Sequence, residues 1–311
     1  RPSDAITVLE GIRRAVGSGT RVIHARGAPI DSADATGFAE AVALATAADA
    51  VVLVLGEHRD MSAEARNRTS LDLPGAQRAL AQAVFATGTP VIAVLLNGRP
   101  LAIPWLAENV PAILESWFPG IEAGTAIADV LFGDYNPSGK LPVTFPRNVG
   151  QVPIYYNHKN TGRPPSETER YTSKYIDVPW TPLYPFGHGL SYTTFAYGAP
   201  RLSRNVIGPA DSLTVEVVVT NTGARAGEEV VQLYLRDDVA SVTRPVKQLR
   251  AFRKIALAPG EANTVSFLIG PDDLAFRGLD LERVIEPGTF TVSVGGSSAD
   301  TRQAHFTVTG S

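Results

Sequence analysis

Carboxyl and guanidinium groups crowd one short stretch of this chain, the loop RDMSAEARNRTSLDLPGAQ at residues 59–77. The loop follows the apolar run AVVLVLG (50–56) and leads into the helix-like run GAQRALAQAVFATG (75–88). A carboxyl group that donates a proton at neutral pH needs a raised pKa, which burial or a second carboxylate supplies and nearby guanidinium groups oppose. Glu64 has a small residue on each side and is the candidate acid, with Glu57 as its rival. Composition alone does not separate such a role from that of an ordinary solvated glutamate.

Three further charged residues of this loop are expected to support it. Arg66, Arg68 and Asp72 carry opposite charges within a few positions of one another, so they can form an ion-pair cluster that shapes the loop. The end of an apolar strand therefore combines one candidate acid, Glu64, with a candidate scaffold of charged side chains.

Two other patterns do not fit the chemistry they suggest. GDYNPSGKL (133–141) resembles a phosphate-binding loop, but five residues separate its glycines and Leu141 stands where a Ser or Thr would bind magnesium. We interpret it as a turn. The five histidines lack the spacing of metal ligands, so neither a metal nor another cofactor is expected. His158 and His188 lie among aromatic residues, and packing is favoured over substrate contact for both.

Residues 1–150 are expected to form a doubly wound α/β domain with a mostly parallel sheet. Apolar runs rich in Val, Ile and Leu alternate with helical runs, which is typical of buried parallel strands covered on both faces. The expected strands are 21–27, 50–56, 90–98 and 112–118, and the expected helices are 1–19, 35–49, 74–88 and 122–134. Ligands of such sheets bind at the carboxyl ends of the strands, which is where the charged loop lies.

The second half of the chain has a different character. Residues 151–198 are dense in Pro, Gly and Tyr and lack periodicity, so we expect an ordered connection that covers another surface. From 199 to 311, short alternating runs are separated by turn signals, which predicts a β-sandwich. The expected strands of this sandwich are 212–223, 228–237, 249–260, 262–269, 288–296 and 303–310.

The overall composition narrows the class of protein. With 44% hydrophobic and 19% charged residues, the chain is typical of a globular protein. The net charge of -3, without a basic block, argues against a nucleic-acid partner. No apolar run approaches the roughly 18 residues needed to span a membrane. Cysteine is absent, which excludes disulfides and cysteine nucleophiles and is compatible with an oxidising compartment.

Several segments together resemble the bacterial β-glucosidases of glycoside hydrolase family 3, of the periplasmic three-domain type. The contiguous run from ILESWFPG to NTGRP (113–164) carries most of the likeness, which extends over nearly the whole chain. The other segments are AEARNRTSLDLPGAQRALAQAV (63–84), NGRPLAIPW (97–105), LYPFGHGLSYTTF (183–195) and FRKIALAPGEANTVSF (252–267).

The resemblance implies a (β/α)8 barrel, then an (α/β)6 sandwich, then a fibronectin type III-like β-sandwich, of which this chain contains the last two. It implies a retaining mechanism with an Asp nucleophile on the barrel and a Glu acid/base that maps onto Glu64. The two carboxyl groups of such a pair lie about 5–5.5 Å apart. We therefore expect the C-terminal portion of a longer enzyme, whose barrel is its partner and whose substrate is a β-glucoside. A periplasmic or secreted location follows from the same resemblance.

Other functions stay open at this point. A β-xylosidase of the same family and a non-catalytic carbohydrate-binding or adhesion module both fit the domain pattern. A flavin or nucleotide protein rests on fold analogy alone. Retention of Glu64 within its motif favours the enzyme.

Overall fold

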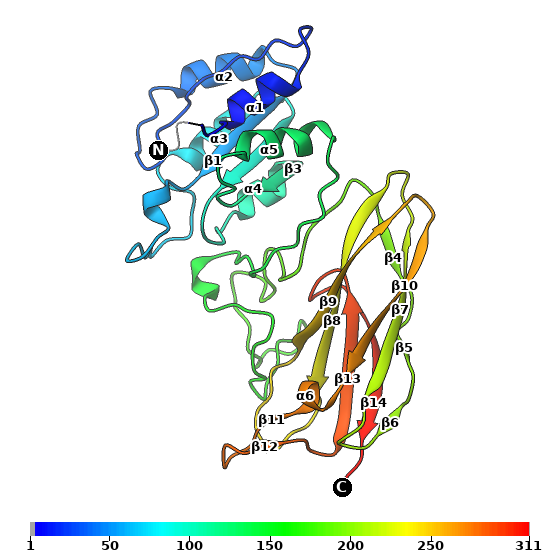
Figure 1. Ribbon diagram of the computed structural model, residues 1–311. Helices are drawn as coiled ribbons and strands as arrows, with labels where there is room; N and C mark the ends of the chain where they lie inside the picture. Colours follow the sequence, from blue (N-terminus) through cyan, green and yellow to red (C-terminus); the bar gives the residue numbers. More distant parts are fainter. Residues whose placement is uncertain (1–3, 311) are drawn as a thin grey trace. The chain divides into compact units, whose positions relative to one another are not determined.

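The computed structural model describes residues 4–310. The chain divides into two compact units (Figure 1). The first runs up to Tyr135 and includes Phe145–Val152, and the second consists of Asn136–Thr144 and the chain from Pro153 onward.

The first unit alternates helices with parallel strands. Its strands are β1 (Val51–Gly56), β2 (Val91–Leu96) and β3 (Ala112–Glu115), paired in the order β1-β2-β3 with every pair parallel. Its α-helices are α1 (Val8–Ala15), α2 (Phe38–Thr46), α3 (Gln77–Phe85), α4 (Pro104–Asn109) and α5 (Ala123–Phe132). Two short 3-10 helices, η1 (Arg59–Met61) and η2 (Val149–Gln151), complete the unit.

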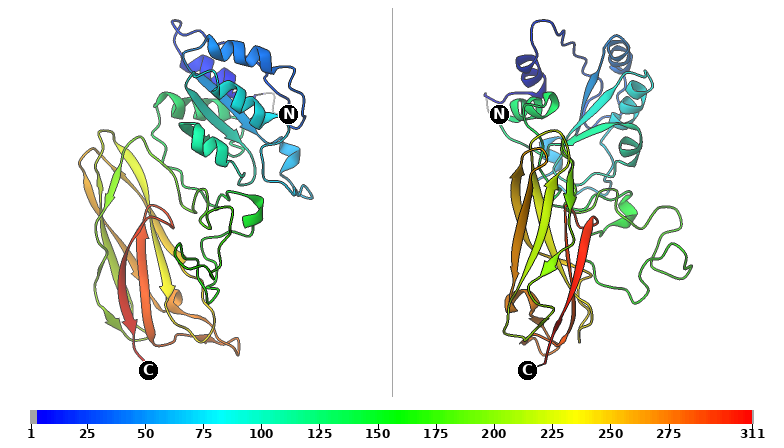
Figure 2. Two further views of the ribbon diagram at one scale, coloured as in Figure 1. Left: turned by 180° about the vertical axis from the view of Figure 1, so that it is seen from behind. Right: turned by 90° about the vertical axis from the view of Figure 1, so that its right-hand side faces the viewer.

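Helices cover both faces of this sheet (Figure 2). Helices α1 and α5 pack on one face, where Val8 and Ile127 join Val94 in an apolar cluster. The two helices can approach closely because Gly11 has no side chain. A Cβ at this position would lie 2.0 Å from the carbonyl oxygen of Gly124. Helices α2 and α3 lie on the other face. Side chains of a strand alternate between the two faces of its sheet, so both layers of helices can pack on it. The predicted doubly wound α/β arrangement is therefore the one observed.

Three local features of this unit differ from the sequence predictions. Residues 21–27 were expected to form a strand, but they are unpaired, and Gly27 has a left-handed φ of +71° that does not fit a strand. Helix α4 was not anticipated, although Pro104 at its first turn is a common helix start. The apolar run 112–118 is a strand only as far as Glu115, and Trp117 has a φ of +53° that ends it.

The second unit is built from antiparallel sheets. One sheet has the order β10-β7-β4, with β5 also paired to β7, and the other has the order β6-β14-β13-β8-β9, in which only the β6–β14 pair is parallel. Its strands are β4 (Phe195–Tyr197), β5 (Arg201–Leu202), β6 (Val206–Ile207), β7 (Leu213–Asn221), β8 (Gly227–Asp237), β9 (Gln248–Leu257), β10 (Ala262–Ile269), β13 (Gly288–Gly295) and β14 (Thr301–Val308). A small pair, β11 (Phe276–Arg277) and β12 (Arg283–Val284), and the short helix α6 (Pro271–Leu274) lie between β10 and β13.

The two sheets share one apolar core. Alternate residues of β7, such as Val215 and Val217, are buried together with Leu233 of β8 and Val292 of β13. The period-2 alternation in the sequence therefore marks the residues that fill a β-sandwich.

Residues 151–198, the aromatic connection, have almost no regular secondary structure. Specific contacts within the second unit hold this segment. Tyr156 stacks on Phe186 with ring centroids 4.4 Å apart and meets Tyr234 of β8 edge-on at 5.6 Å. The hydroxyl of Tyr156 also accepts a hydrogen bond from the amide of Leu249. The connection is ordered because its aromatic rings pack on the sandwich.

Candidate active site

The charged loop begins at the carboxyl edge of the parallel sheet, where three polar residues meet. Glu57 follows β1, Asn97 follows β2 and Glu115 ends β3. The strand register places Gly56 opposite Leu96 and Leu95 opposite Glu115, so the three side chains emerge at neighbouring positions. Loops at this edge are the usual place for ligand sites in such sheets.

The change from strand to loop is fixed by Gly56 and Gln77. Gly56 has a φ of +139°, and a Cβ there would lie 2.0 Å from the carbonyl oxygen of Leu96, so only glycine fits. The buried side chain of Gln77 accepts a hydrogen bond from the Gly56 amide and donates one to the Gly56 carbonyl, both at 2.7 Å. It also donates to the carbonyl of Ile30, so α3 holds the start of the loop in place.

Glu57 is buried and paired with two arginines. Its side chain is 0% exposed, and its Oε1 lies 2.6 Å from Nη1 of Arg68 and 2.9 Å from Nε of Arg99. The amide of Gly98 donates a hydrogen bond to Oε2. A buried charge needs such partners, because an unpaired carboxylate in this position would lose its hydration without compensation.

The same two arginines hold the backbone of the loop. Arg68 donates through Nη2 to the carbonyl of Asp72 at 3.0 Å, and Arg99 donates through Nη2 to the carbonyls of Arg66 and Met61. These carbonyls lie on both sides of Glu64 in sequence. The loop is therefore tied to the buried carboxylate of Glu57 before and after Glu64, and we call this network of Glu57, Arg68 and Arg99 the arginine clamp.

Glu64 lies in an exposed turn between the tied points. The amide of Arg66 donates to the carbonyl of Ala63 at 3.1 Å, which closes the turn. Ala65 within it has a left-handed φ of +59°, a conformation that non-glycine residues adopt at a cost of about 1–2 kcal/mol. The Glu64 carboxyl group is thus accessible on a turn whose backbone is constrained.

The structure separates the other residues that the sequence grouped around the loop. Arg66 has an exposed side chain, and its carbonyl takes part in the arginine clamp. The carboxylate of Asp72 accepts a hydrogen bond from the hydroxyl of Ser70 at 3.1 Å. Arg68 pairs with Glu57. Arg99 and Gln77 were not singled out from the sequence, and the only signal for Arg99 was its place in NGRPLAIPW.

Glu115 is a second carboxyl group at this edge of the sheet, and it is partly buried. Burial raises its pKa to about 7, against hydrogen bonds from the Trp117 amide and the Asn97 side chain, and the Glu57 carboxylate adds to the increase. The Trp117 amide donates at 3.0 Å and Asn97 Nδ2 at 3.3 Å. Asn97 Oδ1 and Ser116 Oγ are buried nearby without hydrogen-bond partners. This edge of the sheet therefore has a titratable group close to neutral pH that is not itself exposed.

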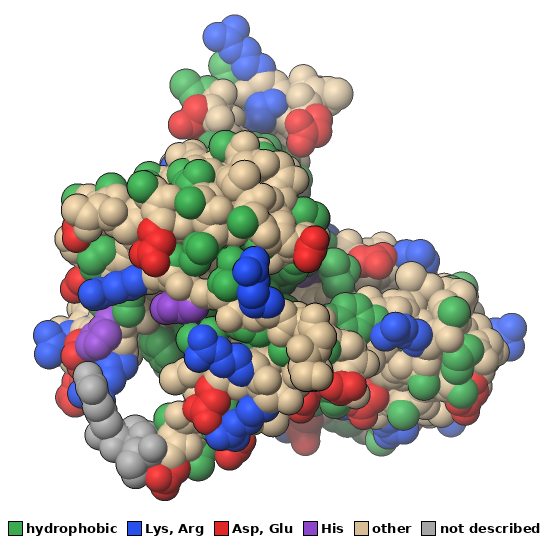
Figure 3. Space-filling model, turned by 90° about the horizontal axis from the view of Figure 1, so that it is seen from above, with side chains coloured by type: hydrophobic (Ala, Val, Ile, Leu, Met, Phe, Trp, Pro, Cys, Tyr) green, Lys and Arg blue, Asp and Glu red, His purple; other side chains and the backbone are tan. Residues whose placement is uncertain are grey.

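The described residues, 4–310, have no arrangement typical of a metal centre or a membrane span. Among them, no three His, Cys, Asp or Glu side chains are arranged to hold a metal ion. No described helix is long and apolar enough to cross a membrane. Over the face shown in Figure 3, Lys and Arg side chains lie among Asp and Glu side chains. Lys140 of the rejected phosphate-loop motif pairs with Glu229 at 3.1 Å and donates to the carbonyl of Gly189.

The fold and the site define a two-unit protein in which a doubly wound α/β unit presents a clamped, exposed glutamate and is followed by a β-sandwich. The model of the glycosyl hydrolase family 3 C-terminal domain matches residues 1–192, and that of the fibronectin type III-like domain matches residues 229–298. The chain belongs to glycosyl hydrolase family 3. The predicted family and fold class are both confirmed.

Curated relatives support this assignment and carry two enzyme names. The chain is 47% identical over 326 residues to the periplasmic beta-glucosidase of Salmonella typhimurium, covering 98% of this chain and 43% of that protein. It is 49% identical over 297 residues to a beta-xylosidase of Formosa agariphila, covering 96% of this chain and 40% of that protein. The chain therefore spans about two fifths of the length of these relatives.

Solved structures agree with the sequence comparisons. The crystal structure of a beta-glucosidase from Listeria innocua in complex with glucose is 42% identical, with a TM-score of 0.94 over 100% of this chain and 43% of that one. A b-glucosidase from Erythrobacter marinus is 43% identical, with a TM-score of 0.92 over 99% of this chain and 44% of that one.

Proposed function

We propose that this chain supplies the acid/base, Glu64, of a retaining glycosidase that removes terminal non-reducing β-D-glucosyl residues. The nucleophile would be an Asp on a (β/α)8 barrel outside this chain, attached to it or held as a separate chain. The observation that carries the proposal is the arginine clamp, which holds an exposed carboxyl group from both sides on a loop at the carboxyl edge of the sheet. A clamp of this kind positions a reacting group.

The role of Glu64 has two steps. Its protonated carboxyl group gives a proton to the leaving glycosidic oxygen while the nucleophile forms the glycosyl-enzyme bond, and its carboxylate then takes a proton from the water that breaks this bond. Glu57 is unsuited to both steps, because its side chain is fully buried and paired with Arg68 and Arg99. We assign Glu57 to holding the loop, together with Arg66, Arg68 and Asp72 as loop-supporting residues.

The substrate class follows from the names of the relatives. One β-glucosidase and one β-xylosidase match the chain over nearly its full length. We therefore propose β-glucosides as substrates, with β-xylosides as the alternative. The Salmonella typhimurium relative is named periplasmic, which supports a periplasmic or secreted location. Without the barrel, we expect no hydrolysis from this chain.

The test is turnover of aryl β-glucosides by the chain combined with its barrel, with Glu64→Gln beside the wild type. A poor leaving group needs the proton, whereas a good one departs without it. We therefore expect Glu64→Gln to lower kcat/KM by about 100-fold or more on a poor leaving group and much less on a good one. Azide should restore turnover of the good leaving group, because it attacks the intermediate without needing a base.

Glu108→Gln is the matched control, because Glu108 is an exposed glutamate on α4 of the same unit. It should leave turnover of both substrates unchanged. Equal losses for poor and good leaving groups in Glu64→Gln would contradict the assignment. Sugar binding without turnover in the presence of the barrel would instead support a non-catalytic module.

A further inference from the structure

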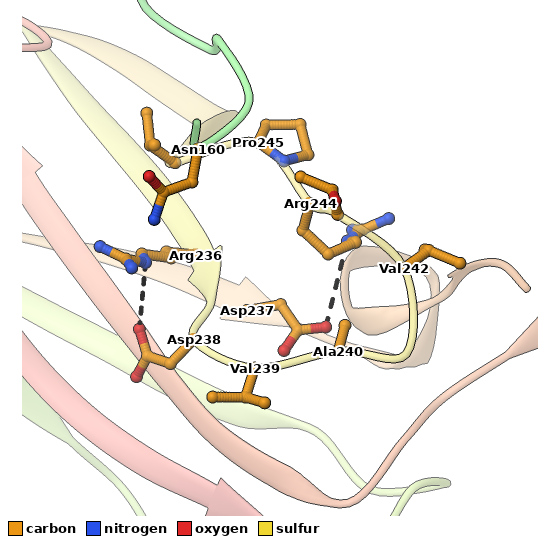
Figure 4. A pocket seen from close by; sticks show the side chains of 11 residues that line it. Asn160, Arg236, Asp237, Asp238, Val239, Ala240, Val242, Arg244 and Pro245 are labelled. Atoms are coloured by element: carbon orange, nitrogen blue, oxygen red, sulfur yellow. Dashed lines mark ion pairs between the residues drawn. The ribbon is translucent and has the colours of Figure 1, made fainter. Parts of the chain in front are cut away.

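A cavity of about 230 Å³ lies in the second unit, at the loop that joins β8 to β9 (Figure 4). The end of β8 and the loop that follows it, residues 236–246, form most of its wall, and Asn160 of the aromatic connection adds a side chain. A water molecule occupies about 30 Å³ in the liquid, so the volume corresponds to several waters or one small molecule.

Two charged side chains that line this cavity form a long ion pair without a hydrogen bond (Figure 4). The side chain of Asp237 is 4% exposed, and its Oδ2 lies 4.0 Å from Nε of Arg244. That distance is too long for a hydrogen bond, and both atoms are buried without any hydrogen-bond partner. Buried polar atoms of native proteins nearly always have a hydrogen-bond partner. Asp237 Oδ2 can therefore accept a hydrogen bond from a bound molecule, and Arg244 Nε can donate one.

The Asp237 carboxyl group has a pKa above its ordinary value. Burial raises this pKa to about 6, the Arg244 guanidinium and a hydrogen bond from the Val239 amide oppose the increase, and Glu286 and Asp238 add to it. An ionised oxygen without a donor is costly to bury, so a bound group that donates a hydrogen bond would be stabilised strongly.

The charges around the cavity balance, which selects the kind of ligand. Arg236 and Asp238 form a second pair at 3.4 Å, so two guanidinium groups and two carboxylates line the cavity. The arginines disfavour a cation and the carboxylates disfavour an anion. A neutral molecule with adjacent hydroxyl groups fits, because one hydroxyl can donate to Asp237 and another can accept from Arg244.

The groups that would hold the ligand are already fixed. Arg244 lies 4.5 Å above the ring of Phe276, and its Nη2 donates to the side chain of Gln248 at 3.2 Å. The neighbouring amide of Val246 donates to the carbonyl of His158, which ties the loop to the aromatic connection. A site whose side chains are ordered before binding loses less entropy when it binds.

We propose that this cavity binds one small neutral polyhydroxy molecule, a monosaccharide or a short polyol, through Asp237 and Arg244. The apolar side chains of Val242 and Pro245 line the same space and would contact the carbon face of a sugar ring. The site belongs to the β-sandwich unit and uses none of the residues assigned to the acid/base loop.

The experiment is a titration of this chain with D-glucose, D-xylose and glycerol, followed by ligand-observed NMR and calorimetry at neutral pH. We expect saturable binding with a dissociation constant on the order of 1 mM for the ligands that fit. Asp237→Asn and Arg244→Met should each weaken it by about tenfold or more, because each removes a charge-assisted hydrogen bond. Asp134→Asn and Arg13→Met, both at exposed positions of the other unit, are the matched controls and should leave binding unchanged.

Val242→Trp keeps both charges and fills the cavity, so it should abolish binding even if Asp237→Asn were to unfold the unit. Melting temperatures of all variants separate lost binding from lost fold. Glu64→Gln should leave this binding intact, which distinguishes the site from the proposed active site. The proposal would be overturned if binding did not saturate at ligand concentrations roughly tenfold above the expected dissociation constant. Binding that survives Val242→Trp would overturn it as well.

Discussion

Each unit has a buried carboxyl group at the end of a strand beside arginines, and the two differ in how completely the arginines satisfy them. Glu57, after β1, has guanidinium nitrogens 2.6 and 2.9 Å from one oxygen and a backbone amide on the other. Asp237, at the end of β8, has its guanidinium partner 4.0 Å away. We call the Glu57 network closed, because its carboxylate is within hydrogen-bond distance of its partners, and the Asp237–Arg244 pair open, because it is not.

The difference indicates what each carboxyl group can do. In the closed network both oxygens of Glu57 have partners, and the Nη2 donors of Arg68 and Arg99 are directed at the loop that presents Glu64. Arg99 Nε pairs with Glu57 by charge but makes no hydrogen bond. An open pair leaves buried atoms that only water or a ligand can satisfy. Burial of an acidic side chain is therefore not by itself a sign of a binding site. Such a side chain indicates a site only where its oxygens lack hydrogen-bond donors within the protein.

Replacement of the two carboxylates should have very different effects on stability. We expect Glu57→Gln to lower the free energy of unfolding by about 3–5 kcal/mol, because it leaves the buried guanidinium groups of Arg68 and Arg99 without their counter-charge. Asp237→Asn should instead raise it at neutral pH, because burial disfavours the charged form of this side chain more than Arg244 favours it. Urea unfolding at neutral pH measures both.

Double-mutant cycles make this comparison sharper. Glu57→Gln with Arg68→Met should show a large coupling energy, and Asp237→Asn with Arg244→Met a smaller one, because only the first pair is within hydrogen-bond distance. Equal losses for the two single variants would remove the distinction between closed and open pairs.

A third carboxyl group, the partly buried Glu115, accepts hydrogen bonds from two amides and predicts a pH dependence of stability. Its pKa is raised from 4.5 to about 7, so the folded chain keeps this proton over a range in which the unfolded chain has lost it. Its contribution to the free energy of unfolding is thus fully present below about pH 4.5 and is lost as the pH rises to about 7. Between about pH 4.5 and pH 7, the free energy of unfolding of the wild type should fall by about 3 kcal/mol relative to that of Glu115→Gln.

Urea unfolding at several pH values between these limits, for the wild type and Glu115→Gln, measures the difference directly. Glu108→Gln is again the control, since its exposed side chain should not change the slope. A constant difference between the wild type and Glu115→Gln across the window would show that Glu115 titrates alike in the folded and unfolded chains.

Much of the architecture could be predicted from the sequence because periodicity reports burial directly. Alternation in 212–223 predicted β7 nearly to the residue, since each second side chain enters the shared core. The run 228–237 predicted β8 equally well, although residues 231–235 of that strand are all buried. Segment 21–27 was assigned wrongly because an apolar run says nothing about whether a neighbouring strand is available to pair with it.

The contacts around the loop could not be predicted in the same way. The sequence places Arg68 near both Glu57 and Asp72, and only the path of the backbone decides that its guanidinium pairs with Glu57 and its remaining donor meets the Asp72 carbonyl. Arg99 is more than thirty positions from the carbonyl of Arg66 to which it donates. Contacts between strand ends depend on sheet register, which periodicity does not fix.

The turn that the closed pair supports offers the smallest and most specific test. Ala65 has a φ of +59°, where glycine has no steric cost, so Ala65→Gly should raise the free energy of unfolding by up to about 1 kcal/mol. Ala63→Gly on the same turn is the control. Ala63 is not among the positive-φ residues, so the change only makes the unfolded chain more flexible and should lower stability by about 0.5 kcal/mol. Chemical denaturation of the two variants measures the contrast. A loss of stability in both would show that the clamp does not hold Ala65 in a strained conformation, and Glu64 would then lie on a turn that the arginines do not constrain.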